Sequence, residues 1–157
     1  MSSFARVSAQ STNDEVTFQL ALKTFQSAVL HRNFAKAANI ICFPLFTSKA
    51  DLGSGQEMPA DAVTIQDFEF YKNDIFNAEV SRILPKLGRE ALSEISRNED
   101  PYYAELKKAR NVKGKMYECY VQYPTKNGKG ENYFAFIFGK INNKYKVIAY
   151  YSKWPLR

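Results

Sequence analysis

One carboxylate and a small group of tyrosines are the residues of this chain that could carry out chemistry. Asp74 stands directly before Ile75 and Phe76. A carboxyl held in an apolar pocket has a raised pKa and can act as a general base, whereas the same group facing water is an ordinary surface charge. The tyrosines that could line a cavity with their hydroxyls are Tyr71, Tyr117 and Tyr150. Because a tyrosine has an apolar body and a polar tip, these rings could equally fill a core without any ligand.

Other groups that enzymes and metal sites use are scarce. The only histidine, His31, falls at the end of a predicted helix, where the helix dipole favours it. Cys42 and Cys119 belong to no CxxC pair, and a structural zinc site needs four Cys or His ligands, so this chain alone cannot form one. We therefore expect no metal and no cofactor. The two cysteines are expected as buried thiols that form no catalytic pair, while a disulfide stays open if the protein is exported.

The charge of the chain is modest and scattered. Lys and Arg number 22 against 16 Asp and Glu, which gives +6, and the densest basic group lies within 107–115. Nucleic-acid-binding proteins concentrate positive charge on one face or stripe, so this pattern favours a solvated surface over a phosphate-binding patch. The composition, 45% apolar and 24% charged, is typical of a globular domain. No run of apolar residues is long enough for a membrane-spanning helix.

The N-terminus permits two interpretations. Residues 1–12 are small and polar, which predicts a loose tail. Within them, Val7, Ser8 and Ala9 precede Gln10 and resemble the small-x-small end of a signal peptide. The sequence therefore leaves open whether the protein is exported to the periplasm or is cytoplasmic with an ordinary polar tail.

The first half of the chain carries apolar residues at helical spacing. Thr12 and Glu15 form a capping box, which predicts the start of a helix of about 16 residues. Its apolar stripe consists of Phe18, Leu22, Phe25 and Val29. Asn33 is expected to cap a second, shorter helix, which Pro44 ends because the residue before proline is pushed out of the helical region. A short strand over 44–49 follows.

A third helical segment follows a turn at 51–55, which is rich in glycine. Thr64 and Asp67 resemble another capping box, and apolar residues continue at helical spacing until Pro85. Residues 86–111 are ambiguous: Glu99–Pro101 predicts a turn, with a short helix or strand on either side.

The last third predicts an antiparallel meander. Residues 117–123 alternate with a period of two, and Asn127–Gly128 signals a hairpin after them. The run 133–138 is apolar on both faces, which predicts a covered central strand with Phe134, Phe136 and Phe138 on one face and Ala135 and Ile137 on the other. Asn142–Asn143 predicts a tight turn before a strand over 145–154.

Helices followed by a run of antiparallel strands indicate an α+β fold. The order contains no linker and no internal repeat, so one domain over 13–157 is expected after the tail.

Two stretches of the chain resemble the nuclear transport factor two-like superfamily, specifically its small bacterial members of unassigned role. One is FQSAVLHRNF followed by AKAANIICFPL at 25–45. The other runs from Thr64 through Tyr71 and Asp74–Phe76 to Ile83. The resemblance covers roughly residues 14–154 and rests on core and turn positions. It implies a cone: a strongly curved, mixed or antiparallel sheet wrapped round N-terminal helices, with a mouth that can hold a ligand.

The resemblance favours a non-enzymatic domain that binds a small ligand or a protein. Related isomerases and cyclases use Asp, Tyr or His inside the cone, and no such set can be matched here residue by residue. The alternative is a small isomerase, cyclase or dehydratase that uses Asp74 with a tyrosine. Tyr71, Tyr117 and Tyr150 are the ligand-binding candidates under the first interpretation. Fold alone does not determine function.

A homodimer through the outer face of the sheet is also expected. The runs 133–138 and 145–151 are apolar on both sides, and an exposed apolar patch of that extent usually marks an interface. Trp154 could lie in that contact or plug one end of the cone. The competing expectation is that residues 86–111 or the N-terminal tail fold over that face instead.

Overall fold

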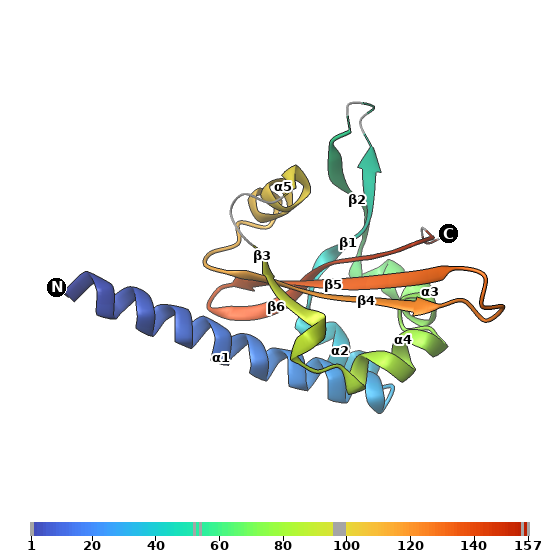
Figure 1. Cartoon of the computed structure of the whole chain (residues 1–157), viewed down its shortest axis with the longest axis horizontal. Coiled ribbons are helices and arrows are strands. Elements are labelled where there is room, and N and C mark those ends of the chain that lie inside the picture. The colour runs from blue at the N-terminus through green and yellow to red at the C-terminus, as the bar shows by residue number, and fades with distance from the viewer. Residues whose placement is uncertain (1, 52, 54, 96–99, 155, 157) are drawn as a thin grey trace.

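Figure 1 shows an α+β fold in which one sheet separates α1–α4 from α5. This computed structural model describes residues 2–51, 53, 55–95, 100–154 and 156. The helical elements are α1 (Ser2–Leu30), α2 (Phe34–Ile40), α3 (Ile65–Ile75), α4 (Ala78–Ile83), η1 (Leu84–Lys86), η2 (Arg89–Ala91) and α5 (Pro101–Ala109). The strands are β1 (Ile41–Asp51), β2 (Glu57–Val63), β3 (Leu92–Ile95), β4 (Met116–Pro124), β5 (Glu131–Ile141) and β6 (Lys144–Ser152). The predicted α+β class is confirmed.

The six strands form a mixed sheet in the order β2-β1-β6-β5-β4-β3. The C-terminal strands make the predicted antiparallel meander, in which β5 lies between β4 and β6. The contact between β1 and β6 is parallel, which makes the sheet mixed. The turn at Asn142 and Asn143 is confirmed, with φ values of 50° and 65°.

The first helix is much longer than expected. The structure shows α1 from Ser2 to Leu30, where the sequence predicted a loose tail and then a helix from Thr12, and Val7–Gln10 lies within this helix. The capping box at Thr12 does not begin the helix, because no proline or glycine interrupts the chain between residues 2 and 30. The predicted stripe of Phe18, Leu22, Phe25 and Val29 is buried in the core.

The second helix ends earlier than predicted. The Asn33 side chain caps α2, as expected, by accepting a hydrogen bond from the backbone of Lys36. However, α2 ends at Ile40, and Pro44 lies inside β1 rather than at a helix end. The ladder between β1 and β6 is irregular from Ile41 to Phe46, so a proline without an N–H is tolerated there.

The third predicted helix is divided in two. The Thr64 hydroxyl accepts the backbone N–H of Asp67 and caps α3, as predicted. The helix then ends at Ile75, and Asn77 caps α4 through a hydrogen bond from the N–H of Val80. Pro85 falls within η1. In the ambiguous region, η2, β3 and α5 are present, while the part of the predicted 99–101 turn at Glu99 lies outside the described residues, as do two residues of the 51–55 turn.

The central strand β5 is buried on both faces, as predicted. Phe134, Phe136 and Phe138 pack in the larger cluster, with side chains of α1–α4. Ala135 and Ile137 belong to a second cluster on the other face, which α5 covers with Tyr102 and Leu106. The sequence left open whether a segment within 86–111 folds over this face. The structure supports that expectation, because α5 lies within this segment and covers the face.

Candidate ligand-binding site

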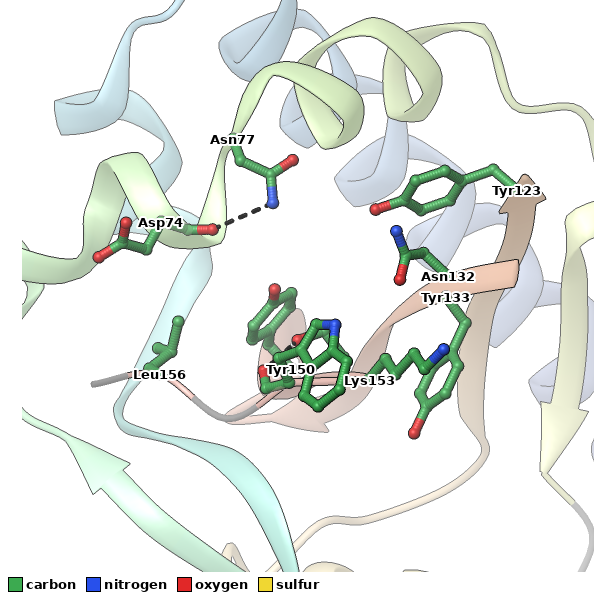
Figure 2. Close-up of a pocket in the computed structure, with 10 residues that line it drawn as sticks. Asp74, Asn77, Tyr123, Asn132, Tyr133, Tyr150, Lys153 and Leu156 are labelled. Atoms are coloured by element: carbon green, nitrogen blue, oxygen red, sulfur yellow. Dashed lines mark hydrogen bonds between the residues drawn. The ribbon is translucent and has the colours of Figure 1, made fainter. Parts of the chain in front are cut away.

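A pocket of about 420 Å³ opens between the α3–α4 junction and one end of the sheet (Figure 2). A volume of this size lies in the lower part of the range found for small-molecule sites. Its walls come from α3, the α4 cap, β4, β5, β6 and the C-terminal segment: Asp74, Asn77, Tyr123, Asn132, Tyr133, Tyr150, Ser152, Lys153, Trp154 and Leu156. Two of the four residues predicted as site residues, Asp74 and Tyr150, are among them.

The helical wall is fixed by one asparagine. The Asn77 side-chain oxygen accepts the backbone N–H of Val80 at 3.0 Å, and its amide nitrogen donates to the backbone carbonyl of Asp74 at 3.3 Å. Both ends of this amide are thus occupied in joining α3 to α4 (Figure 2). Asn77 therefore positions the wall, and these two bonds leave one of its amide N–H groups unused.

Two tyrosines supply hydroxyls that stay protonated. Burial raises the pKa of both Tyr123 and Tyr150. For Tyr150 a side-chain hydrogen bond with Ser152 opposes this effect, and the Asp74 charge adds to it. Because the ordinary pKa of tyrosine is already about 10, both phenols are neutral at physiological pH and can donate a hydrogen bond.

The strand wall holds polar groups without protein partners. Among the described residues, the Tyr123 hydroxyl and the Asn132 amide make no hydrogen bond to the protein. Figure 2 shows the two side chains next to one another, pointing into the same space. The register explains this, because Tyr123 on β4 faces Asn132 on β5 directly across the ladder. A ligand in the pocket can therefore bond to both from one position.

The C-terminal segment completes the pocket with a cation and an aromatic ring. The Lys153 ammonium donates to the backbone carbonyl of Glu131 at 3.1 Å and lies 5.6 Å from the centre of the Trp154 ring. The Trp154 side chain is 70% exposed. The backbone carbonyl of Trp154 accepts a hydrogen bond from the Ser152 hydroxyl at 2.7 Å, which ties this segment to β6.

Asp74 lines the pocket from its rim. The residue is exposed, and Figure 2 shows its carboxylate pointing away from Tyr123 and Asn132 while its backbone carbonyl faces Asn77. The structure therefore does not place this carboxylate in apolar surroundings.

Tyr71 and Tyr117 lie outside the pocket. Tyr71 packs against the larger core cluster, half-buried. The Tyr117 ring stacks on Phe18 with 4.1 Å between ring centres, and burial raises the pKa of its hydroxyl to about 12. Both tyrosines contribute to packing, which was the other interpretation of these rings.

Sequence reasoning missed Tyr123 and Asn132, although a signal for them existed. Asn127–Gly128 marks the loop between β4 and β5, and counting outward from this loop sets Tyr123 opposite Asn132. Asparagine and tyrosine both carry polar groups, so this pair, near the ends of two strands, is a candidate for a binding site rather than for the apolar core.

A second polar cluster lies under α5 on the other face of the sheet. The buried Glu118 carboxylate accepts hydrogen bonds from the hydroxyls of Tyr103 and Tyr151, at 2.5 and 2.9 Å. The Lys49 ammonium lies 4.1 Å from the centre of the Tyr151 ring and 4.7 Å from that of Tyr102. The Glu118 carboxylate and the two hydroxyls that donate to it satisfy one another, whereas the buried Tyr102 hydroxyl has no hydrogen-bond partner among the described residues. We interpret the cluster as the attachment of α5 and β1 to the sheet.

Neither cysteine is bonded. Cys119 is buried, and burial raises the pKa of its thiol to about 12, while Cys42 is half-buried and packs on the opposite face. In the part of the chain that the structure describes, no group of three or more His, Cys, Asp or Glu side chains is placed to hold a metal ion. No helix of the described residues has the length and apolar character needed to cross a membrane.

Comparisons with known proteins add little to this picture. No protein-family model matches the chain, and no curated protein matches it. Among solved structures, it is similar to the association domain of C. elegans CaMKII, with 9% sequence identity and a TM-score of 0.37. The alignment covers 91% of this chain and 97% of that domain. A TM-score this low supports no conclusion about function.

Proposed function

We propose that this protein is a non-enzymatic binding domain that takes a small ligand into the pocket between α3–α4 and the ends of β4–β6. One observation carries the proposal: the Tyr123 hydroxyl and the Asn132 amide face the same space without protein partners. Polar groups are otherwise well matched in folded proteins, so a converging unmatched pair inside a pocket is typical of a binding site. The resemblance to nuclear transport factor two-like domains, whose cones can hold ligands, supports the same proposal.

Trp154 makes the proposal directly testable. It is the only tryptophan of the chain, so its indole N–H gives a single resonance in a ¹⁵N correlation spectrum. We expect a panel of small aromatic probes, with 3-phenylpropanol and 3-phenylpropanamide as first members, to shift this resonance saturably. The double variant Tyr123→Phe with Asn132→Leu should weaken that binding.

The control for this experiment is Tyr133→Phe. Tyr133 also lines the pocket, but Figure 2 shows its ring pointing away from Tyr123 and Asn132. Removing its hydroxyl should therefore leave probe binding unchanged. Equal binding by the double variant and the wild type, with both folded by circular dichroism, would refute the assignment of the site.

An enzymatic function has less support. It requires the Asp74 carboxylate to work with a tyrosine, and this carboxylate points away from Tyr123 in Figure 2. Among the described residues, its side chain makes no hydrogen bond or ion pair. Turnover of any probe that is abolished by Asp74→Asn, with the fold intact, would favour the enzyme instead.

The homodimer through the sheet stays a prediction. The prediction assumes an uncovered second face, whereas α5 covers the centre of that face with Tyr102 and Leu106. A dimer would have to use residues outside this covered area. Light scattering at micromolar concentration tests it, since a mass near the 18.0 kDa of one chain would exclude the dimer.

A further inference from the structure

The strand register places four polar side chains of the pocket on one side of the sheet. Tyr123 on β4 faces Asn132 on β5. Because side chains alternate along a strand, Asn132 points to the same side as Phe134, which faces Ser152 on β6. Tyr150, two residues before Ser152, lies on this side too, and its hydroxyl interacts electrostatically with that of Tyr123. We call Tyr123, Asn132, Tyr150 and Ser152 the polar face of the pocket.

The groups of this polar face are uncharged at neutral pH, and the charged residues of the pocket are directed elsewhere. The backbone N–H of Lys153 donates to the Tyr133 carbonyl at 3.4 Å, and the Lys153 ammonium donates to the Glu131 carbonyl at 3.1 Å. Figure 2 shows the Tyr133 ring pointing away from Tyr123 and Asn132. The Asp74 carboxylate also points away from this pair in Figure 2.

A charged head group would therefore meet no opposite charge on the polar face. Removing water from an ion without a counter-ion costs free energy. The electrostatic effect of Asp74 on Tyr150 is that of a negative charge, which also opposes an anion there. Glu79, which acts on Tyr123, is paired with Arg82 at 2.5 Å, so their charges largely offset one another. These surroundings favour an uncharged ligand.

The Asn132 side chain determines which uncharged group matches best. Its amide carries N–H donors and a carbonyl acceptor side by side in one plane, and neither has a protein partner among the described residues. A second amide can pair with both at once, because its carbonyl accepts an N–H of Asn132 while its own N–H donates to the Asn132 oxygen. An ester has no donor for the second bond. In Figure 2 the nitrogen end of Asn132 lies towards the Tyr123 hydroxyl, so a carbonyl bound there can also accept from this phenol.

We infer that the pocket binds a small uncharged molecule through a carboxamide or lactam group, which pairs with the Asn132 amide and accepts a further hydrogen bond from Tyr123. This inference rests on the proposed function and adds the chemical class of the ligand. Trp154 also lines the pocket and is 70% exposed, so its ring offers an apolar surface to the rest of the ligand.

The test compares three probes that share one body: 3-phenylpropanamide, methyl 3-phenylpropionate and 3-phenylpropionate. The amide has a carbonyl and N–H donors, the ester has a carbonyl without a donor, and the acid carries a negative charge. Titrations of the full chain at neutral pH follow the Trp154 indole resonance. We expect the amide to bind about fivefold more tightly than the ester, which corresponds to one hydrogen bond, and at least as much more tightly than the acid.

Two variants separate the contributions of the polar pair. Asn132→Leu should give the amide and the ester equal affinity, because the acceptor for the N–H of the ligand is gone. Tyr123→Phe should weaken both probes by a similar factor and keep the preference, because both carbonyls lose the phenol. The control Tyr133→Phe should change neither the affinities nor the preference, since the Tyr133 ring points away from the pair in Figure 2. Circular dichroism establishes that each variant is folded.

The outcomes distinguish this inference from the proposed function. Equal affinity for amide and ester, tighter binding of the acid, or a preference that survives Asn132→Leu would overturn the inference while the proposed binding function stands. If Asn132→Leu does not fold, the order of the three affinities in the wild type decides the inference. If neither these probes nor 3-phenylpropanol shifts the indole resonance, the proposed function lacks its expected result and the inference is overturned with it.

Discussion

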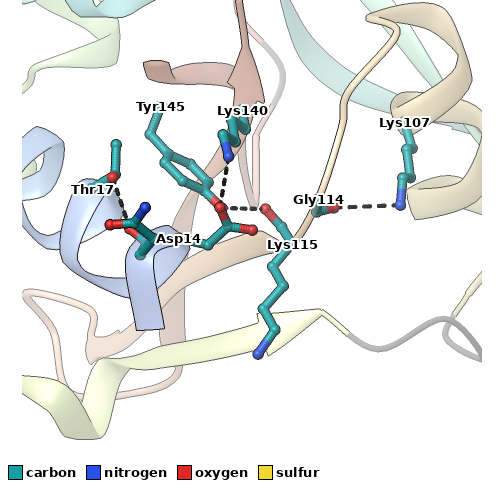
Figure 3. Close-up of polar contacts among 8 residues, drawn as sticks. Asp14, Thr17, Lys107, Gly114, Lys115, Lys140 and Tyr145 are labelled. Carbon is teal, nitrogen blue, oxygen red and sulfur yellow. Dashed lines mark hydrogen bonds and ion pairs between the residues drawn. The ribbon is translucent and has the colours of Figure 1, made fainter. Parts of the chain in front are cut away.

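One buried ion pair adds to the apolar packing that attaches α1 to the sheet. The Asp14 carboxylate accepts a hydrogen bond from the Lys140 ammonium at 2.7 Å (Figure 3). Asp14 is only 2% exposed, while the Lys140 side chain is 18% exposed. Lys140→Met removes the charge and retains much of the apolar stem. It leaves a buried carboxylate without its ion-pair partner.

The expected cost follows from the burial of Asp14. Removing one member of a buried ion pair costs about 3–5 kcal/mol, because the remaining charge is uncompensated. Water can reach the Lys140 side of this pair, so we expect the lower end, about 3 kcal/mol. For a chain of this length each kcal/mol shifts the melting temperature by about 2–4 °C, which gives a decrease of about 6–12 °C. The double variant Asp14→Leu with Lys140→Met should recover most of the loss, since no charge then remains buried.

Thermal and urea unfolding followed by circular dichroism measure both variants. The matched control is Lys144→Met, which removes an exposed lysine from the same hairpin and should change stability by less than about 0.5 kcal/mol. If Lys140→Met costs no more than Lys144→Met, the pair is a surface contact and the reasoning is wrong. A double variant less stable than Lys140→Met alone would show that the cost comes from lost packing.

Three further predictions concern the same core. Gly114→Ala should destabilise the protein in urea titrations, because its φ is +74° and a Cβ would lie 2.7 Å from the Asp14 carboxylate; a midpoint equal to wild type would contradict this. In a Cys42→Ser variant, Cys119 should react with iodoacetamide much more slowly than in the unfolded chain, because burial raises its pKa to about 12. Stability should fall at alkaline pH: the pKa of Tyr117 is about 10 unfolded and about 12 folded, so its contribution is complete below about pH 10 and is lost as the pH rises towards 12. Tyr117→Phe should lessen that fall in the urea midpoint, and an identical fall in wild type and variant would exclude Tyr117 as a cause.

The C-terminal strands could be predicted from the sequence because their signals are local. The alternation in 117–123 and the turn at Asn142–Asn143 need no tertiary information, and both are confirmed. The residues of 133–138 are apolar on both faces, which correctly indicated that something covers each face. The sequence could not show that α5 covers the second face, because the contact between α5 and β5 joins residues that are distant in sequence.

The errors in the first half have physical causes too. Capping boxes mark favourable helix starts, but Thr12 lies inside α1 because nothing before it breaks a helix. A proline usually ends a helix, but α2 ends before Pro44 is reached, because Ile41 is already paired with Val147 in the sheet. At Thr12 the continuous helix outweighed the local capping signal, and at Pro44 pairing with a distant strand did so.

The candidate site was only half predictable for the same reason. Asp74 and Tyr150 line the pocket, but the single-residue argument could not distinguish an inward carboxylate from one at the rim. Tyr71 and Tyr117 have the same chemistry as Tyr150 and lie in the packing of the core instead. Which tyrosine faces a cavity is decided by strand register and by the C-terminal segment, not by residue type.

The polar groups in the pocket differ in their partners from the two buried carboxylates of the molecule. Asp14 has Lys140, and Glu118 has two tyrosine hydroxyls, so these groups are matched within the protein. Tyr123 and Asn132 instead border an open pocket, where water can satisfy them. A ligand that displaces this water must replace its hydrogen bonds, since stripping such groups without replacement costs affinity. The pocket should therefore select ligands by a polar head group first, and the apolar surface of Trp154 should add affinity only to molecules that already carry one.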